Sequence, residues 1–75
     1  MEKIDALRQM ERAWREAGDH SENIERIMLR MKENGRPTPE LQKELSIATK
    51  LYDEAMHIYK EASRSYYELF VDQLA

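Results

Sequence analysis

The segment ATKLYDE-AMHIYKE-ASRSYYE, residues 48–68, repeats one pattern three times with a period of seven residues. Each repeat begins with alanine, has tyrosine at its fifth position and ends with glutamate. A seven-residue apolar period keeps one stripe of an α-helix turned toward a neighbouring helix, because about 3.5 residues then complete one turn. The segment therefore predicts a helix whose main feature is a packing surface, not a reactive site.

Extended in both directions, the seven-residue period defines two core positions. One position holds Leu41, Ala48, Ala55, Ala62 and Leu69, and the other holds Leu45, Tyr52, Tyr59 and Tyr66. Alanine lets two helix backbones come close together, and tyrosine fills the space beside it while its hydroxyl stays near the edge. We expect coiled-coil-like packing in which alanine layers alternate with larger residues.

The segment NGRPTP, residues 34–39, contains both prolines of the chain and one of its two glycines. Gly35 can adopt the left-handed conformation that ends a helix, and Pro37 prevents the helix from continuing. Thr38 can cap a following helix with its hydroxyl, and Pro39 suits the first helical position. These signals predict a helix over about 2–34, a turn at 35–38 and a helix over about 39–73.

The first helix is expected to present an apolar stripe with alternating spacings of three and four residues. Its members are Leu7, Met10, Trp14, Ala17, Ser21, Ile24, Met28 and Met31. The segment Gly18–Ser21 is poor helix material, because glycine costs roughly 1 kcal/mol relative to alanine and Asp and Ser prefer caps. The unbroken register favours one continuous helix, bent there, over a break at which Ser21 would cap a separate helix.

A short connection makes two long helices antiparallel neighbours. Folding the chain about its turn places Trp14 opposite Tyr59 and Ser21 opposite Tyr52, so we expect Gly18 and Ser21 to make room for the tyrosines. Residues 1–75 thus form one all-α domain, an antiparallel two-helix hairpin that can pair with a second copy into a four-helix bundle. A chain this short has a marginal core of its own, so help from a partner is expected.

Composition excludes several functional classes. The chain has no cysteine, its net charge is −3, and charged residues make up 36% of it. A protein that binds polyanions in general needs an excess of Lys and Arg, and the net charge of this chain does not provide one. There is no apolar run of the ~18 to 20 residues that span a membrane, and the first residues lack the apolar core of a signal peptide. We expect a soluble, cytoplasmic protein.

Three groups of polar residues have compositions that could suggest a chemical site. Glu54 and His57 have the Glu-x-x-His spacing of di-iron bundles, but the heptad turns His57 outward, where it continues a ladder of helix-stabilising charges. His20 has carboxylates nearby but no second nitrogen ligand or nucleophile. These observations predict no catalytic residue, no cofactor and no metal ligand, and hence no enzyme. A basic group near the turn, comprising Arg26, Arg30, Lys32 and Arg36, leaves a small nucleic-acid-binding hairpin as an alternative.

Apolar residues that two helices cannot cover are the candidate partner-binding residues. Ile47, Leu51 and Ile58 form a stripe on one flank of the second helix, whereas Met56 and Phe70 lie on the other flank. A contiguous apolar patch on a small protein marks an interface. Two occupants remain open: a second copy of the chain, or the helix of another protein.

The segments KENGRPTPEL, residues 32–41, and EAMHIYKEASRSYY, residues 54–67, resemble the turn and second helix of the small E-type co-chaperones of bacterial type III secretion. Those proteins are hairpins that act with a helical-repeat chaperone to keep the needle subunit from polymerising in the cytoplasm. The resemblance spans residues 32–70, rests on layout, alanine spacing and a Tyr-Tyr pair, and does not cover the first helix. It implies a needle subunit and a second chaperone as partners, with Leu51 and Ile58 at the contact. The alternatives are a homodimeric four-helix bundle, regulatory or engineered, and the nucleic-acid-binding hairpin.

Overall fold

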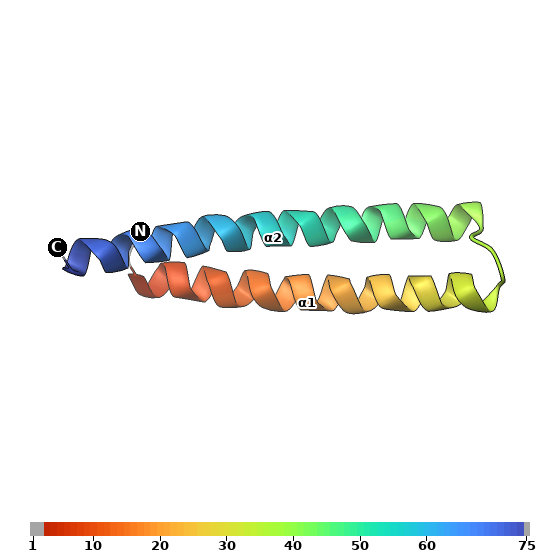
Figure 1. The fold of residues 1–75 in the computed structure, drawn as a ribbon, viewed down its shortest axis with the longest axis horizontal. Coiled ribbons are helices and arrows are strands. Elements are labelled where there is room, and N and C mark those ends of the chain that lie inside the picture. The colour runs from red at the N-terminus through yellow and green to blue at the C-terminus, as the bar shows by residue number, and fades with distance from the viewer. Residues whose placement is uncertain (1–2, 75) are drawn as a thin grey trace.

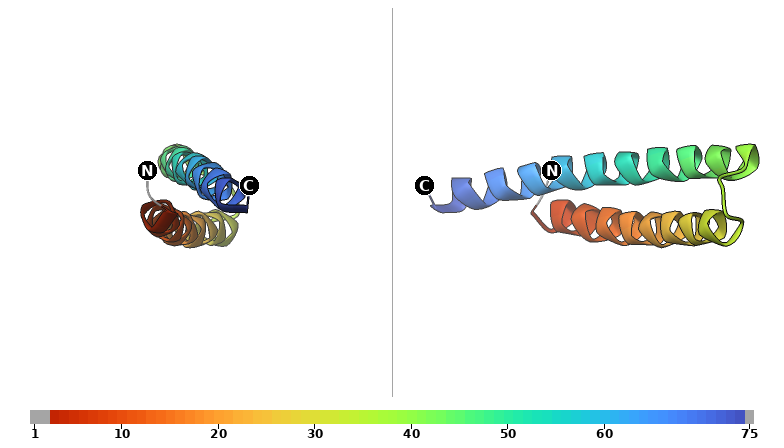
Figure 2. Two further views of the ribbon diagram at one scale, coloured as in Figure 1. Left: turned by 90° about the vertical axis from the view of Figure 1, so that its left-hand side faces the viewer. Right: turned by 45° about the vertical axis from the view of Figure 1, so that its right-hand side comes forward.

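The computed structural model describes residues 3–74, with side chains over residues 4–69. Two helices make up the molecule: α1 (Lys3–Glu33) and α2 (Pro39–Leu74), which run antiparallel along each other (Figure 1). The hairpin measures 57 × 15 × 14 Å. Figure 2 shows the helices side by side from two further directions, and α2 continues beyond the start of α1. The predicted all-α helical hairpin is confirmed.

The turn between the helices has the capping geometry that its residue types predict. Gly35 has a φ of +78°, in the left-handed region that favours glycine. The Asn34 N–H donates to the Arg30 carbonyl at 3.0 Å and closes the last turn of α1. At the start of α2, the Leu41 N–H donates to Thr38 Oγ1 at 3.2 Å. Thr38 is thus the N-cap, and Pro39 follows as the first helical residue.

Helix α1 runs through Gly18–Ser21 without interruption. The alternative with a break at Ser21 is therefore wrong for this structure. The predicted role of Gly18 is also wrong: a Cβ built at Gly18 would meet no atom within 4 Å. Tyr52 therefore does not need a glycine at position 18, and the space above Gly18 is open.

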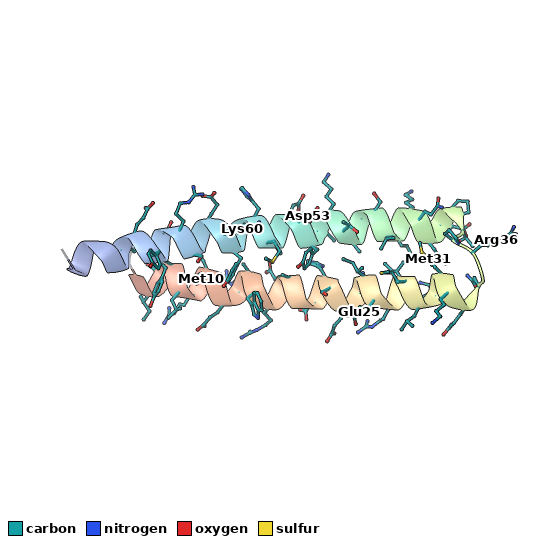
Figure 3. The ribbon with its side chains drawn as sticks, in the orientation of Figure 1. Met10, Glu25, Met31, Arg36, Asp53 and Lys60 are labelled. Atoms are coloured by element: carbon teal, nitrogen blue, oxygen red, sulfur yellow. The ribbon has the colours of Figure 1, made fainter. Side chains whose placement is uncertain are left out.

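Among the described residues, alanine accounts for six of the eight buried residues of the core. Its buried members are Ala6, Ala13, Ala17, Ile27, Leu41, Ala48, Ala55 and Ala62. The α2 members are those that the seven-residue period predicts, and Leu45, Tyr52, Tyr59 and Tyr66 are half-buried beside them. Larger aliphatic residues meet only near the turn, where Ile24, Met31 and Leu45 pack against Ile27, Leu41 and Ala48. Figure 3 shows Met31 between the two helices at that end.

The predicted stripe of α1 is wrong at three of its eight positions, where the buried residue is the one just before the predicted one. Leu7, Trp14 and Met28 are 38%, 62% and 57% exposed. The residues immediately before them, Ala6, Ala13 and Ile27, are buried in their place. At two of these positions the residue in the contact is a smaller one, Ala6 for Leu7 and Ala13 for Trp14. At the third, Ile27 is similar in size to Met28 and packs against Ala48, so the difference there is one of register and not of size. The other predicted positions are confirmed: Ala17 is buried, and Met10, Ser21, Ile24 and Met31 are half-buried.

Substitution of alanine for each of the two glycines should change the free energy of unfolding in opposite directions. Gly35→Ala is expected to destabilise the hairpin by about 1 to 2 kcal/mol, because a Cβ is strained at positive φ. Gly18→Ala should stabilise it by about 0.5 to 1 kcal/mol, because Gly18 lies in a regular helix with open space around it. Denaturant unfolding followed by helicity measures both. Destabilisation by Gly18→Ala would contradict a continuous α1.

The alanine layers should not tolerate larger residues. Ala13→Leu and Ala55→Leu are each expected to lower the free energy of unfolding by about 1 to 3 kcal/mol through overpacking. Lys50→Leu introduces the same side chain at an exposed position and should change it by no more than about 0.5 kcal/mol. The same denaturation experiment compares the three variants, and equal effects would show that the close contact lies elsewhere.

Candidate partner-binding surfaces

Many large apolar side chains lie on the outside of this hairpin. Those that are exposed are Ile4, Leu7, Trp14, Met28, Leu29, Ile47, Leu51, Ile58 and Tyr67. No large side chain among the described residues is fully buried. Soluble proteins bury most of their large aliphatic side chains, so the arrangement of small residues inside and large residues outside needs an explanation.

Three of the exposed residues form the first surface, which we call the Leu51 face: Ile47, Leu51 and Ile58. They are 53%, 41% and 49% exposed. A shallow hollow of about 340 Å³ lies along part of this face, bordered on α1 by Arg26 and Arg30. All three residues were predicted from the sequence as partner-binding residues, and they lie beside the helix contact as expected.

The second surface, which we call the Trp14 face, lies on the opposite flank. It comprises Leu7, Trp14 and Met28 from α1 and Met56 from α2. The Trp14 ring leans on Tyr59 with ring centroids 5.3 Å apart and planes at 48°, so the predicted neighbourhood of these residues is confirmed. The face still exposes 62% of Trp14.

A hollow of about 200 Å³ opens on the Trp14 face. Its lining consists of Trp14, Ala17, Gly18, Ser21, Tyr52 and Met56. The hollow exists because Gly18 and Ser21 present little or no side chain between two larger residues. It is the open space that the sequence analysis assigned to the tyrosines.

The predicted partner-binding residues therefore divide between two faces. Ile47, Leu51 and Ile58 share the Leu51 face, whereas Met56 is half-buried at the edge of the hollow on the Trp14 face. The side chain of Phe70 lies outside the described residues. Sequence reasoning missed the contribution of α1, because it placed Leu7, Trp14 and Met28 in the helix contact. The available signal was the pair Ala6 and Ala13, which has the spacing of the α2 alanines.

The polar candidates do not form a site. Glu54 and His57 are both exposed on α2. Over the described residues, no group of three or more His, Asp or Glu side chains is placed to hold a metal ion. Within the same part of the chain, neither helix is long and apolar enough to cross a membrane.

Two cations of the basic group near the turn have acidic partners. Arg26 Nη2 lies 3.7 Å from Glu22 Oε2, and Arg30 Nη1 donates to Glu44 Oε2 at 3.1 Å. The second pair joins α1 to α2 on the Leu51 face. Because carboxylates accompany these arginines, the group offers less positive potential to a phosphate backbone than its sequence suggests.

No protein-family model, curated protein or solved structure matches this chain. The two faces are therefore the features from which its function is inferred.

Proposed function

We propose that this chain is a non-catalytic interaction module that binds a helical partner protein on its Leu51 face. The observation that supports this most is the inverted distribution of side-chain size, with alanine between the helices and large aliphatic residues outside them. Burial of such a residue stabilises a complex by about 1.5 to 3 kcal/mol. In the lone hairpin the exposed residues stay in water, so most of that stabilisation is not obtained.

The shape of the Leu51 face suits an amphipathic helix. Ile47, Leu51 and Ile58 follow one another at spacings of four and seven residues along α2, which is the spacing of anchors in helix–groove recognition. Positive charge borders the face at Arg26 on α1, and negative charge borders it at Glu54 on α2. A partner helix with an apolar stripe, an acidic residue toward Arg26 and a basic residue toward Glu54 would complement it.

The resemblance of residues 32–70 to the E-type co-chaperones gives this proposal a biological form. In that role the hairpin would act in the cytoplasm with a helical-repeat chaperone, and together they would keep a type III secretion needle subunit from polymerising. Two observations support it: the chain is a helical hairpin, and Leu51 and Ile58 are accessible beside the helix contact. The large apolar residues of α1 are not accounted for by this role.

A second candidate, a homodimeric four-helix bundle of structural or regulatory function, is favoured by the exposed Trp14 face. The two candidates use opposite flanks of the hairpin and are compatible in one molecule. The nucleic-acid-binding hairpin is the weakest alternative, because Arg26 and Arg30 both lie against carboxylates.

Substitution on the Leu51 face should abolish partner binding without unfolding the chain. The test variant is Leu51→Gln with Ile58→Gln, and the matched control is Lys50→Gln with His57→Gln, which changes the preceding, outward-facing residues to the same side chain. We expect the test variant to keep its helicity and to bind at least roughly a hundredfold more weakly, because two buried anchors are lost. The measurement is co-purification and titration with the needle subunit and helical-repeat chaperone of the same bacterium.

Three results would count against this proposal. Undiminished binding by the test variant would remove the Leu51 face from the contact. Equal loss in the control would indicate a general effect of surface change. Absence of binding by the unsubstituted chain, with full helicity, would exclude the co-chaperone role.

A further inference from the structure

We propose that the Trp14 face binds the Trp14 face of a second copy, with both turns at the same end, to form an antiparallel four-helix bundle. This inference deepens the second candidate above, the homodimeric bundle, by giving its contact and orientation, and it does not rest on partner binding at the Leu51 face. It concerns the opposite flank, so either can fail without the other.

A strip without charge runs along the Trp14 face. On α1 it consists of Leu7, Trp14, Ser21 and Met28, and on α2 it consists of Gln42, Thr49, Met56 and Ser63. Each of these residues comes directly after a residue of one core position in its helix. The corresponding strip on the other flank includes Glu16, Arg30 and Glu44. Depletion of charge together with aromatic and methionine residues is typical of the core of a protein interface.

The size of the face fits a stable dimer. The long and intermediate dimensions of the hairpin, 57 and 15 Å, give a projected outline of at most about 850 Å². A standard interface buries about 800 Å² per partner. A helix laid alone in this face would cover only part of it, whereas a second hairpin of the same dimensions would cover all of it.

The residues that border the strip determine whether the turns of the two copies lie at the same end or at opposite ends. Within one hairpin, Trp14 lies level with Tyr59 and Arg30 with Glu44, which fixes the level of every residue along the axis. With both turns at the same end, each α1 faces α2 of the second copy at the same level. Glu11 then lies opposite Lys60 of the second copy, and the two residues are offset along the helix axis by the length of two residues. Ile4 lies opposite Tyr67 of the second copy with the same offset.

With the turns at opposite ends, α1 would face α1 of the second copy. Glu11 would then lie opposite Glu25 of the second copy, and the same repulsion would occur twice because a two-fold interface is isologous. Like charges placed against each other are unfavourable and select against a pairing. Figure 3 shows Glu25 on the outer side of α1 and Lys60 on the outer side of α2, where they can reach a second molecule.

The hollow beside Gly18 borders the contact in this arrangement. Trp14 of one copy lies at the level of Met56 and Ser63 of the other, so the indole packs beside Met56, which lines the second copy's hollow. Trp14 is the only tryptophan of the chain, so its fluorescence reports this contact directly. Removal of a 62% exposed indole from water should shift its emission to shorter wavelength as concentration rises.

The principal experiment measures mass against concentration by sedimentation for Met28→Glu and Leu29→Glu. These neighbours are 57% and 58% exposed, and both substitutions introduce the same charge into the same helix. Met28 lies on the Trp14 face, whereas Leu29 is turned about 100° farther and points away from α2. We expect a dimer for the unsubstituted chain and for Leu29→Glu. For Met28→Glu we expect a dissociation constant raised roughly a hundredfold, because the charge enters the interface twice.

A set of charge substitutions at exposed positions tests the relative orientation of the two copies. None of these substitutions lies near the core. Glu11→Lys and Lys60→Glu should each weaken the dimer, and the double variant should restore it, with helicity unchanged throughout. If Glu11→Lys strengthened the dimer, the turns would lie at opposite ends and the stated arrangement would be wrong. The proposal would also be overturned by a monomer at all concentrations with invariant Trp14 emission, or by equal effects of Met28→Glu and Leu29→Glu.

These failures are distinguishable from failure of the proposed function. A monomeric chain that still binds a helical partner through Leu51 and Ile58 would refute the dimer alone. A dimer that dissociates with Met28→Glu but binds no helical partner would refute the Leu51 proposal alone.

Discussion

The close approach of two helix backbones at the alanine layers is the contact on which the rest of this structure depends. Ala6, Ala13 and Ala17 on α1 meet a face of α2 in which Ala48, Ala55 and Ala62 recur every seven residues. At such layers the side chains of two neighbouring helices have little thickness, so the axes can come close together and larger residues are excluded from the contact. The tyrosines of α2 then lie at the edge of the contact, where their rings can pack and their hydroxyls can stay near water.

The same constraint determines the surface. Where alanine fills the contact between the helices, no interior space is left for large side chains, and Leu7, Trp14, Leu51 and Ile58 lie on the two flanks, whereas Ile27 and Leu41 are buried near the turn. Alanine burial removes little apolar area from water, so the lone hairpin is stabilised less than a domain with a conventional core. Partner binding on the flanks would add apolar burial that the chain cannot obtain from its own two helices. The proposed client contact at Leu51 and the proposed self-contact at Trp14 both follow from this one feature.

Much of the fold could be predicted from particular residues. Gly35, Thr38 and Pro39 act locally, so their types alone predicted the capping geometry of the turn. The α2 contact was also predictable, because alanine and tyrosine alternate there over three repeats. On α1 the largest apolar residues misled the prediction: Leu7, Trp14 and Met28 have a regular spacing, but the depth available at the contact is set by α2. Ile47, Leu51 and Ile58 could be found as exposed residues from the sequence, whereas the Trp14 face and its hollow required the structure.

The most direct test of this account is the helicity-monitored melting temperature of the unsubstituted chain as a function of its concentration. A fold whose alanine core is too small to be stable alone should melt at low temperature when dilute, and its melting temperature should rise steadily with concentration as the flanks become covered. A high melting temperature that is the same at all concentrations would show that the alanine contact alone stabilises the hairpin. In that case the exposed apolar residues would not be needed for stability, and the central claim would be wrong.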